Sequence, residues 1–216
     1  MDYARARAAM VESQIRTADV TDPAIIASFR AVPREAFAPA AVKSIAYGDM
    51  ELEVAPGRTL LRPRYLAKLI QALAPTPKDK ALELAGATGY GAAVLAGCVR
   101  EVITLDPNPD LSFAASAALE QGKVRGVKAV SQPVPEGWAD GAPYDIIILN
   151  GAAEFVPDAW LDQLKDGGRL GVIVRDGAAG QARIYLKAGS ACAYRVAFDA
   201  APPVAPALTK QRTFAF

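Results

Sequence analysis

The segment from Ala81 to Gly91 constrains the fold more than any other part of the chain. It reads Ala-Leu-Glu-Leu-Ala-Gly-Ala-Thr-Gly-Tyr-Gly, and a helix-like Ala-Ala-Val-Leu-Ala follows it. This pattern predicts a strand, a tight turn and the start of a helix. Small residues in such a turn let a ligand approach the backbone, and the free N–H groups of the helix N-terminus point at that ligand. We therefore expect a nucleotide-type cofactor loop.

Asp106 follows the loop at the sequence spacing typical of a ribose-binding acid. The apolar run 101–105 ends in Asp106, about 20 residues after the loop, where a carboxylate accepts hydrogen bonds from two ribose hydroxyls. Asp106 could instead cap the next helix, and Asn108 or Asp110 could hold the ribose in its place. We favour ribose binding by Asp106, which indicates an adenosine-containing ligand.

The chain from Lys80 onward alternates between strand and helix patterns. Strands are predicted at 80–84, 101–105, 127–131, 144–149 and 169–174, and helices at about 89–97, 109–121 and 157–165. Alternation at this spacing is typical of a parallel sheet with right-handed crossovers. The segments 182–188 and 193–200 predict an antiparallel hairpin at the sheet edge, and 213–216 a last short strand.

The N-terminal part has a different character. Helices are predicted at about 3–16, from Pro23 to about Ala31, and from Pro63 to the proline-rich segment 75–77, with an irregular segment between the second and third. We expect an α/β fold of the Rossmann-like type, with a mostly parallel, doubly wound sheet. Residues 1–78 would form a helical region over the cofactor edge and residues 79–216 the core, within one compact unit.

Composition excludes several classes of function. The chain has 216 residues, of which 52% are apolar, and a formal net charge of +1, so a nucleic-acid partner is not expected. It contains no histidine and only two cysteines, which argues against Ser-His-Asp catalysis and against a metal site. No apolar run is long enough for a membrane span and the N-terminus has no signal pattern, so we expect a cytoplasmic protein, either monomer or homodimer.

Several segments resemble one known family in motif order over about the first 175 residues. They read Val-Pro-Arg-Glu-Ala-Phe at 32–37, Gly-Arg-Thr-Leu-Leu-Arg-Pro at 57–63, Gly-Tyr-Gly-Ala-Ala-Val-Leu-Ala at 89–96, Pro-Tyr-Asp at 143–145 and Gln-Leu-Lys-Asp-Gly-Gly-Arg-Leu at 163–170. In these segments the chain resembles the protein-L-isoaspartate O-methyltransferase family of class I S-adenosylmethionine-dependent methyltransferases.

The resemblance implies methyl transfer from S-adenosylmethionine to the free carboxylate of an isoaspartyl residue in a protein or peptide. A carboxylate with a pKa of about 4 is already a nucleophilic anion at neutral pH, so the reaction needs alignment and exclusion of water more than an acid or base. The resemblance also implies which residues bind the cofactor: Glu83, Ala85, Gly86, Ala87, Gly89, Tyr90, Asp106, Pro107 and Asn150.

Three departures from the family pattern bear on activity. Leu61 stands where the family places a serine that positions the substrate carboxylate, and a leucine cannot donate that hydrogen bond. Ala85 and Ala87 replace loop glycines, which costs on the order of 1 kcal/mol wherever the backbone needs a positive φ. The Gly-Asp-Gly expected after the third strand is replaced by Gln-Pro-Val at 132–134. We therefore expect impaired transfer.

The sequence allows more than one role for Arg62 and Arg64, and more than one function for the chain. Arg62 and Arg64 flank Pro63 where the substrate carboxylate would arrive; they either grip that carboxylate or form a solvated helix start. The chain as a whole could be a degenerate relative that keeps the fold and acts by binding. A nicotinamide-dependent oxidoreductase is disfavoured, because the Gly-x-Gly-x-x-Gly pattern is not met at 85–90 and no histidine is available.

Overall fold

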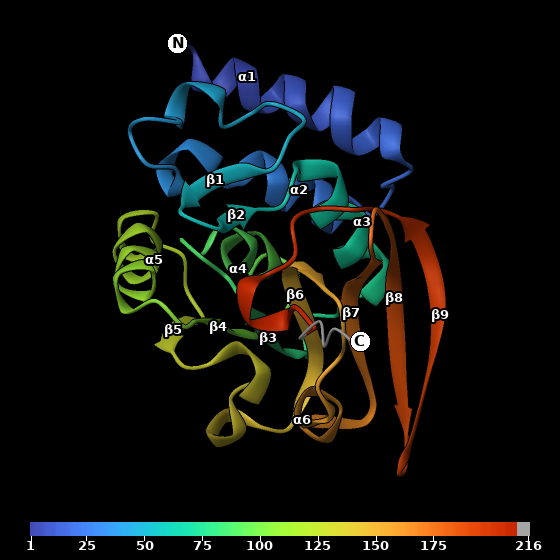
Figure 1. Ribbon diagram of the computed structural model, residues 1–216. Helices are drawn as coiled ribbons and strands as arrows, with labels where there is room; N and C mark the ends of the chain where they lie inside the picture. Colours follow the sequence, from blue (N-terminus) through green and yellow to red (C-terminus); the bar gives the residue numbers. More distant parts are fainter. Residues whose placement is uncertain (211–216) are drawn as a thin grey trace, which may run out of the picture.

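The computed structural model describes residues 1–210, and its centre is a seven-stranded sheet in the order β5-β4-β3-β6-β7-β8-β9 (Figure 1). The strands are β3 (Lys80–Leu84), β4 (Glu101–Asp106), β5 (Val127–Ser131), β6 (Tyr144–Ala153), β7 (Leu164–Asp176), β8 (Ala179–Ala188) and β9 (Ala191–Asp199). Strands β3 to β7 pair in parallel, whereas β7, β8 and β9 form an antiparallel edge. This confirms the predicted α/β fold with a mostly parallel sheet.

The helices of the core occupy both faces of the sheet, as doubly wound folds require. They are α3 (Pro63–Leu73), α4 (Tyr90–Leu95), α5 (Pro109–Gln121) and α6 (Asp158–Asp162). One apolar cluster joins the sheet to α3, α4 and α5, and a second cluster around Trp160 of α6 fills the opposite face. Successive residues of β6, such as Ile146 and Ile147, belong to different clusters because side chains alternate across a strand.

The first 60 residues gather at the top of the view in Figure 1. Helix α1 (Tyr3–Met10) continues through a wider helical turn at Val11–Ile15 and a tight one at Arg16–Ala18, and α2 (Pro23–Ala31) follows. Asp22 caps α2 by accepting from the N–H groups of Ala24 and Ile25. Pro23 occupies the first helical position, where the sequence predicts the helix to begin.

Some sequence predictions need correction. The segment expected to be irregular contains an antiparallel hairpin, β1 (Leu52–Ala55) and β2 (Arg58–Leu60), whose strands are too short to show an alternating pattern. The helix expected at 157–165 ends at Asp162, because the chain joins β7 from Leu164 onward. The strand expected at 213–216 lies outside the described residues.

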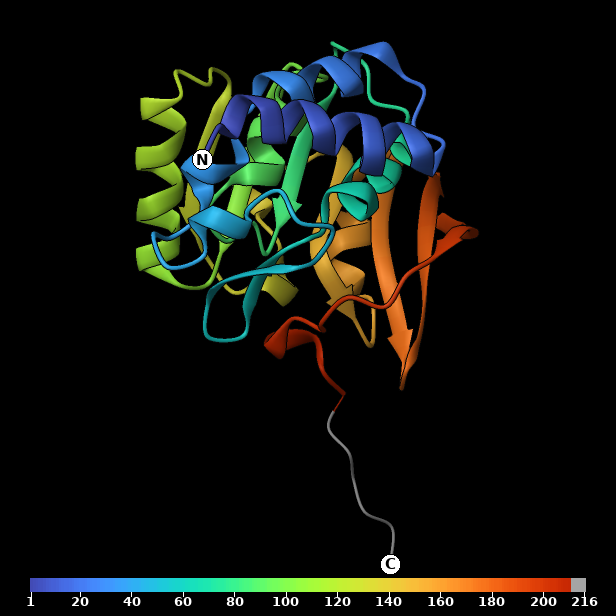
Figure 2. The same ribbon diagram turned by 90° about the horizontal axis from the view of Figure 1, so that it is seen from above.

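The N-terminal region and the core share one apolar cluster. Met10, Phe29 and Leu69 belong to the same cluster as Val94 and Ile146, so packing continues across the predicted boundary at residues 78 and 79. Figure 2 shows α5 and the β8–β9 hairpin at opposite ends of the sheet, with α1 between them. Among residues 1–210, no helix is both long enough and apolar enough to cross a membrane.

Candidate cofactor and substrate site

The predicted cofactor loop joins β3 to α4, and its backbone has an unusual conformation. Ala85, Ala87 and Gly89 have φ values of +57°, +50° and +85°. Glycine adopts this left-handed region readily, whereas a residue with a Cβ is strained there. Both alanines are buried, at 1% and 2% exposure. The loop therefore keeps a glycine-type conformation with alanine at two of three positions.

Glu83 lies beneath the loop and supports it. Its Oε2 accepts hydrogen bonds from Thr104 Oγ1 at 2.7 Å and from the Ala92 N–H at 3.1 Å. A Cβ on Gly86 would lie 1.9 Å from Thr104 Oγ1, and one on Gly91 would lie 1.9 Å from Glu83 Oε1. The two glycines are therefore needed because the carboxylate and hydroxyl fill the space under the turn.

The environment of Glu83 favours its neutral form. Burial raises the pKa of Glu83 to about 8, and the hydrogen bonds from Thr104 and Ala92 oppose this shift only in part. Glu83 therefore keeps its proton at neutral pH and acts as a structural group inside the fold, 1% exposed.

Asp106 closes β4 directly beside the loop. Its Oδ2 accepts from the Ala87 N–H at 2.9 Å and its Oδ1 from the Asn108 N–H at 3.0 Å. Oδ2 also pairs with the guanidinium of Arg58 on β2. Asn108, rather than Asp106, is the N-cap of α5, and the predicted Pro107 is exposed between them. The carboxylate lies where the ribose was expected, with an arginine already bound to it.

Asn150 on β6 links the β1–β2 hairpin to the loop. Its Oδ1 accepts from the Leu61 N–H at 3.1 Å, while its Nδ2 donates to Thr59 O at 3.3 Å and to Ala85 O at 3.2 Å. One side-chain amide thus ties β2, the cofactor loop and the end of β6 together. The hairpin consequently lies over the carboxyl ends of β3, β4 and β6.

Leu61, which the sequence places at the family's serine position, lies inside the fold. Its side chain is fully buried, with 0% exposure, and belongs to the apolar cluster that includes Leu60 and Leu66. The leucine side chain therefore presents no exposed surface to a substrate in this structure. A serine side chain at this position would be smaller than the leucine and would leave space beside its hydroxyl.

Arg62 and Arg64 each meet a carboxylate of the chain itself. Arg62 forms two hydrogen bonds of 2.7 Å with Glu51, and Arg64 lies 3.3 Å from Asp49. Both guanidinium groups also lie over the ring of Tyr65. Burial is the largest single influence on the pKa of Glu51 and raises it. The hydrogen bond from Arg62, a backbone hydrogen bond and the charges of Arg62 and Arg64 together outweigh burial and leave the pKa below its usual value. Neither arginine is a simple solvated helix start.

Tyr90 faces the interior. Its ring is fully buried, meets Phe29 and Phe37 edge-on, and lies 4.6 Å from the guanidinium carbon of Arg34. Arg34 donates to Leu61 O at 2.9 Å and to Ala46 O at 2.8 Å, so it fixes the backbone next to Leu61. Because the Tyr90 side chain is buried in the interior, only the backbone of Tyr90 is available to contact a cofactor.

Sequence reasoning missed three residues that shape this site: Arg34, Arg58 and Thr104. Arg58 stands inside the segment 57–63 that carried the family resemblance, but its partner is 48 residues away. Thr104 is a polar residue at a buried position of β4, and this contrast was a signal that could have found it.

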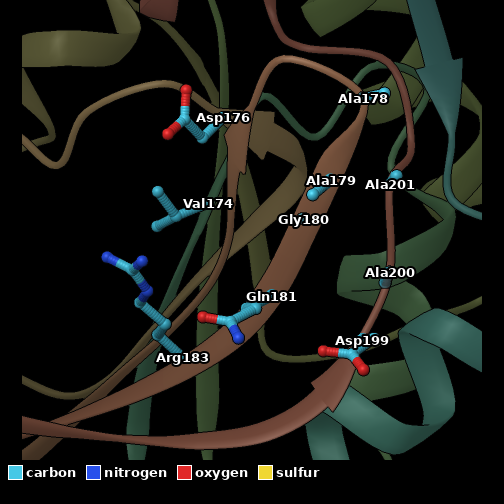
Figure 3. Close-up of a pocket in the computed structure, with 10 residues that line it drawn as sticks. All are labelled: Val174, Asp176, Ala178, Ala179, Gly180, Gln181, Arg183, Asp199, Ala200 and Ala201. Carbon is cyan, nitrogen blue, oxygen red and sulfur yellow. The ribbon is translucent and has the colours of Figure 1, made fainter.

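A separate cavity of about 680 Å³ lies at the junction of β7, β8 and the end of β9 (Figure 3). Asp176, Gln181, Arg183 and Asp199 are among the residues that line it. None of the predicted site residues reaches it, and its walls include no strand-to-helix turn of the cofactor type. Within residues 1–210, no group of three or more His, Cys, Asp or Glu is arranged to hold a metal ion.

Comparison with known proteins agrees with this geometry. The family model for protein-L-isoaspartate(D-aspartate) O-methyltransferase matches residues 5–196. A protein-L-isoaspartate O-methyltransferase of Methylorubrum extorquens is 40% identical over 172 residues, which are 78% of this chain and 74% of the relative. One of a Picosynechococcus species is 35% identical over 175 residues, which are 81% of this chain and 78% of the relative.

Solved structures show the same fold. A protein-L-isoaspartate O-methyltransferase superposes with a TM-score of 0.80 at 23% identity, covering 92% of this chain and 65% of that one. A Plasmodium falciparum chain of the same description, in complex with S-adenosyl-L-homocysteine, gives 0.76 at 18% identity, covering 92% of this chain and 97% of that one. On the family model and these sequence identities, the chain belongs to the protein-L-isoaspartate O-methyltransferase family.

Proposed function

We propose that the protein transfers the methyl group of S-adenosylmethionine to the free carboxylate of isoaspartyl residues in proteins or peptides. The observation that carries this proposal, beside family membership, is the left-handed backbone at Ala85 and Ala87. Strained non-glycine residues persist where the surrounding structure enforces them, and they gather at functional sites.

The residues present fit the cofactor. Asp106 ends the strand next to the loop, and its carboxylate suits a ribose diol. The backbone of residues 85–89 approaches from the other side, held by Glu83 and Thr104 from below. S-adenosylmethionine, when bound, supplies a methyl group on a positively charged sulfur. The chain itself binds the adenosine half and keeps water out of the site.

The remaining demands on the protein are small. The attacking carboxylate is already an anion at neutral pH, so the absence of histidine from the sequence does not exclude the reaction. Alignment and exclusion of water fall to the β1–β2 hairpin, which Asn150 and Arg34 hold in place. Arg62 and Arg64 remain our candidates for orienting the substrate carboxylate, in exchange with Glu51 and Asp49.

We infer that the substrate is an isoaspartyl-containing protein or peptide, because the chain belongs to the protein-L-isoaspartate O-methyltransferase family. The net charge of +1 provides no strong attraction for a nucleic acid. We further expect the protein to act in the cytoplasm, either as a monomer or as a homodimer. The rival function, a degenerate relative that only binds, has no support among the comparisons.

Labelled-methyl transfer tests the proposal. The protein is incubated with methyl-labelled S-adenosylmethionine and an isoaspartyl peptide, and the matching aspartyl peptide is the control. We expect label in the isoaspartyl peptide alone. Binding of the cofactor without transfer to either peptide would instead favour the rival function.

A further inference from the structure

The ion pair between Arg58 and Asp106 joins the hairpin to the predicted ribose carboxylate. The Asp106 side chain is buried, with 2% exposure, and the Arg58 side chain is largely buried, with 11% exposure. They come from different parts of the fold, since Arg58 belongs to β2 and Asp106 ends β4 in the main sheet. The pair therefore spans the gap between the hairpin and the cofactor loop.

The ion pair with Arg58 uses hydrogen-bonding capacity of Asp106 that a ribose would need. A carboxylate has about four lone-pair sites, two on each oxygen. Oδ2 accepts from Arg58 and from the Ala87 N–H, and Oδ1 accepts from the Asn108 N–H. One site is left, whereas a ribose diol brings two hydroxyls to such a carboxylate. The ribose cannot be held in the usual way while Arg58 keeps its place.

Resting on the proposed function, we propose that Arg58 determines cofactor affinity by competing with the ribose of S-adenosylmethionine for the Asp106 carboxylate. In the free protein the guanidinium occupies the ribose position. Cofactor binding displaces it, and the cost of breaking the pair lowers the observed affinity. The hairpin itself need not move, because its backbone is held separately by Asn150.

Few contacts hold the Arg58 guanidinium at Asp106. Its Nε is buried without a hydrogen-bond partner among the described residues, and Asp106 is its one recorded side-chain partner within residues 1–210. Arg62 differs, since Glu51 binds it through both Nε and Nη2. Arg34 differs as well, with two backbone carbonyls as acceptors. A guanidinium held at a single point exchanges its partner more easily than one held at two.

The test compares S-adenosylhomocysteine binding by wild-type protein and the Arg58→Gln variant, using titration calorimetry. Glutamine keeps much of the side-chain length and removes the charge. We expect the variant to bind at least about tenfold more tightly, which corresponds to about 1.4 kcal/mol. Arg58→Lys keeps the positive charge and should stay close to wild type.

A matched control uses an ion pair of similar burial that lies away from the site. Arg169 pairs with Asp79 at 2.8 Å, with exposures of 21% and 10%, at the opposite end of the parallel strands. Arg169→Gln should leave the dissociation constant unchanged. Thermal unfolding provides a second readout: Arg58→Gln should melt at a lower temperature than wild type without ligand, and saturating S-adenosylhomocysteine should raise its melting temperature by more.

The outcomes separate the two proposals. If wild-type protein binds S-adenosylhomocysteine and Arg58→Gln binds it equally or more weakly, Arg58 does not compete with the ribose. The proposed function would then remain intact. Absence of binding by both folded proteins would overturn the cofactor assignment, and the competition with it. Tighter binding by Arg58→Gln and Arg58→Lys alike would also contradict the proposal, because the lysine retains the charge that should compete.

Discussion

Glu83 is the residue of the site whose ionisation is coupled most directly to folding. Burial raises its pKa from the usual 4.5 of a glutamate to about 8, so between these pH values the folded state holds a proton that the unfolded state has released. The stabilising contribution is therefore complete below about pH 4.5 and is lost as the pH rises toward 8. Stability should fall over this interval for that reason.

Glu83→Gln removes this titration while keeping the shape of the neutral acid. Urea unfolding at a series of pH values should show the variant gaining stability relative to wild type by up to about 1.4 kcal/mol per pH unit between these limits. A difference in unfolding free energy that does not depend on pH would contradict the assignment of a buried, neutral Glu83.

Leu61 raises a separate question, because its side chain fills the core where the family carries a hydroxyl. Leu61→Ser and Leu61→Ala both open a cavity and should each cost about 2 to 5 kcal/mol of unfolding free energy. Only serine adds a donor for the substrate carboxylate. We expect Leu61→Ser to methylate an isoaspartyl peptide roughly ten- to a hundredfold faster than Leu61→Ala. Equal rates would show that the hydroxyl has no role in this chain.

The strand-loop-helix element from β3 to α4 was the part best predicted from sequence. Its signals are local: an apolar run, small residues and a resumed helix pattern. Ala85 and Ala87 have positive φ values, which is the condition under which alanine at a loop-glycine position was predicted to be strained. The prediction placed the strain correctly because the backbone of such a turn follows from the strand and helix that it joins.

This element carries its own prediction. Replacing Ala85 and Ala87 together with glycine should relieve the strain and tighten S-adenosylhomocysteine binding, as calorimetry would measure. Ala74→Gly is the matched control, since Ala74 also has a positive φ, of +46°, but ends α3 away from the loop. The control should leave binding unchanged. Weaker binding by the loop double variant would reject the steric explanation.

The β1–β2 hairpin was the element that sequence reasoning missed. Its strands span four and three residues and pair only with each other, so neither shows a readable period. What positions the hairpin is remote in sequence: Asn150 is 89 residues from Leu61, and Asp106 is 48 from Arg58. Such pairings depend on the finished fold. For the same reason, the pairing of Arg62 with Glu51 and of Arg64 with Asp49 could not be predicted from the sequence.

At the scale of the whole molecule, the fold brings the carboxyl ends of β3, β4 and β6 beneath a hairpin from the N-terminal region. The two apolar clusters fix the sheet, and the continuous packing between α3 and the core fixes the N-terminal region on it. The site therefore depends on both halves of the chain. In the proposed function, residues 1–78 would supply the cover and the candidate substrate contacts, and the sheet would supply the cofactor loop and Asp106.

In the proposed function, this arrangement of hairpin, loop and sheet methylates isoaspartyl carboxylates. The most direct measurement is tandem mass spectrometry of an isoaspartyl peptide and its aspartyl counterpart after incubation with the protein and S-adenosylmethionine. We predict a single added methyl group, located at the isoaspartyl residue, and none on the aspartyl peptide. Methylation of both peptides, at another residue, or of neither despite cofactor binding would contradict the account.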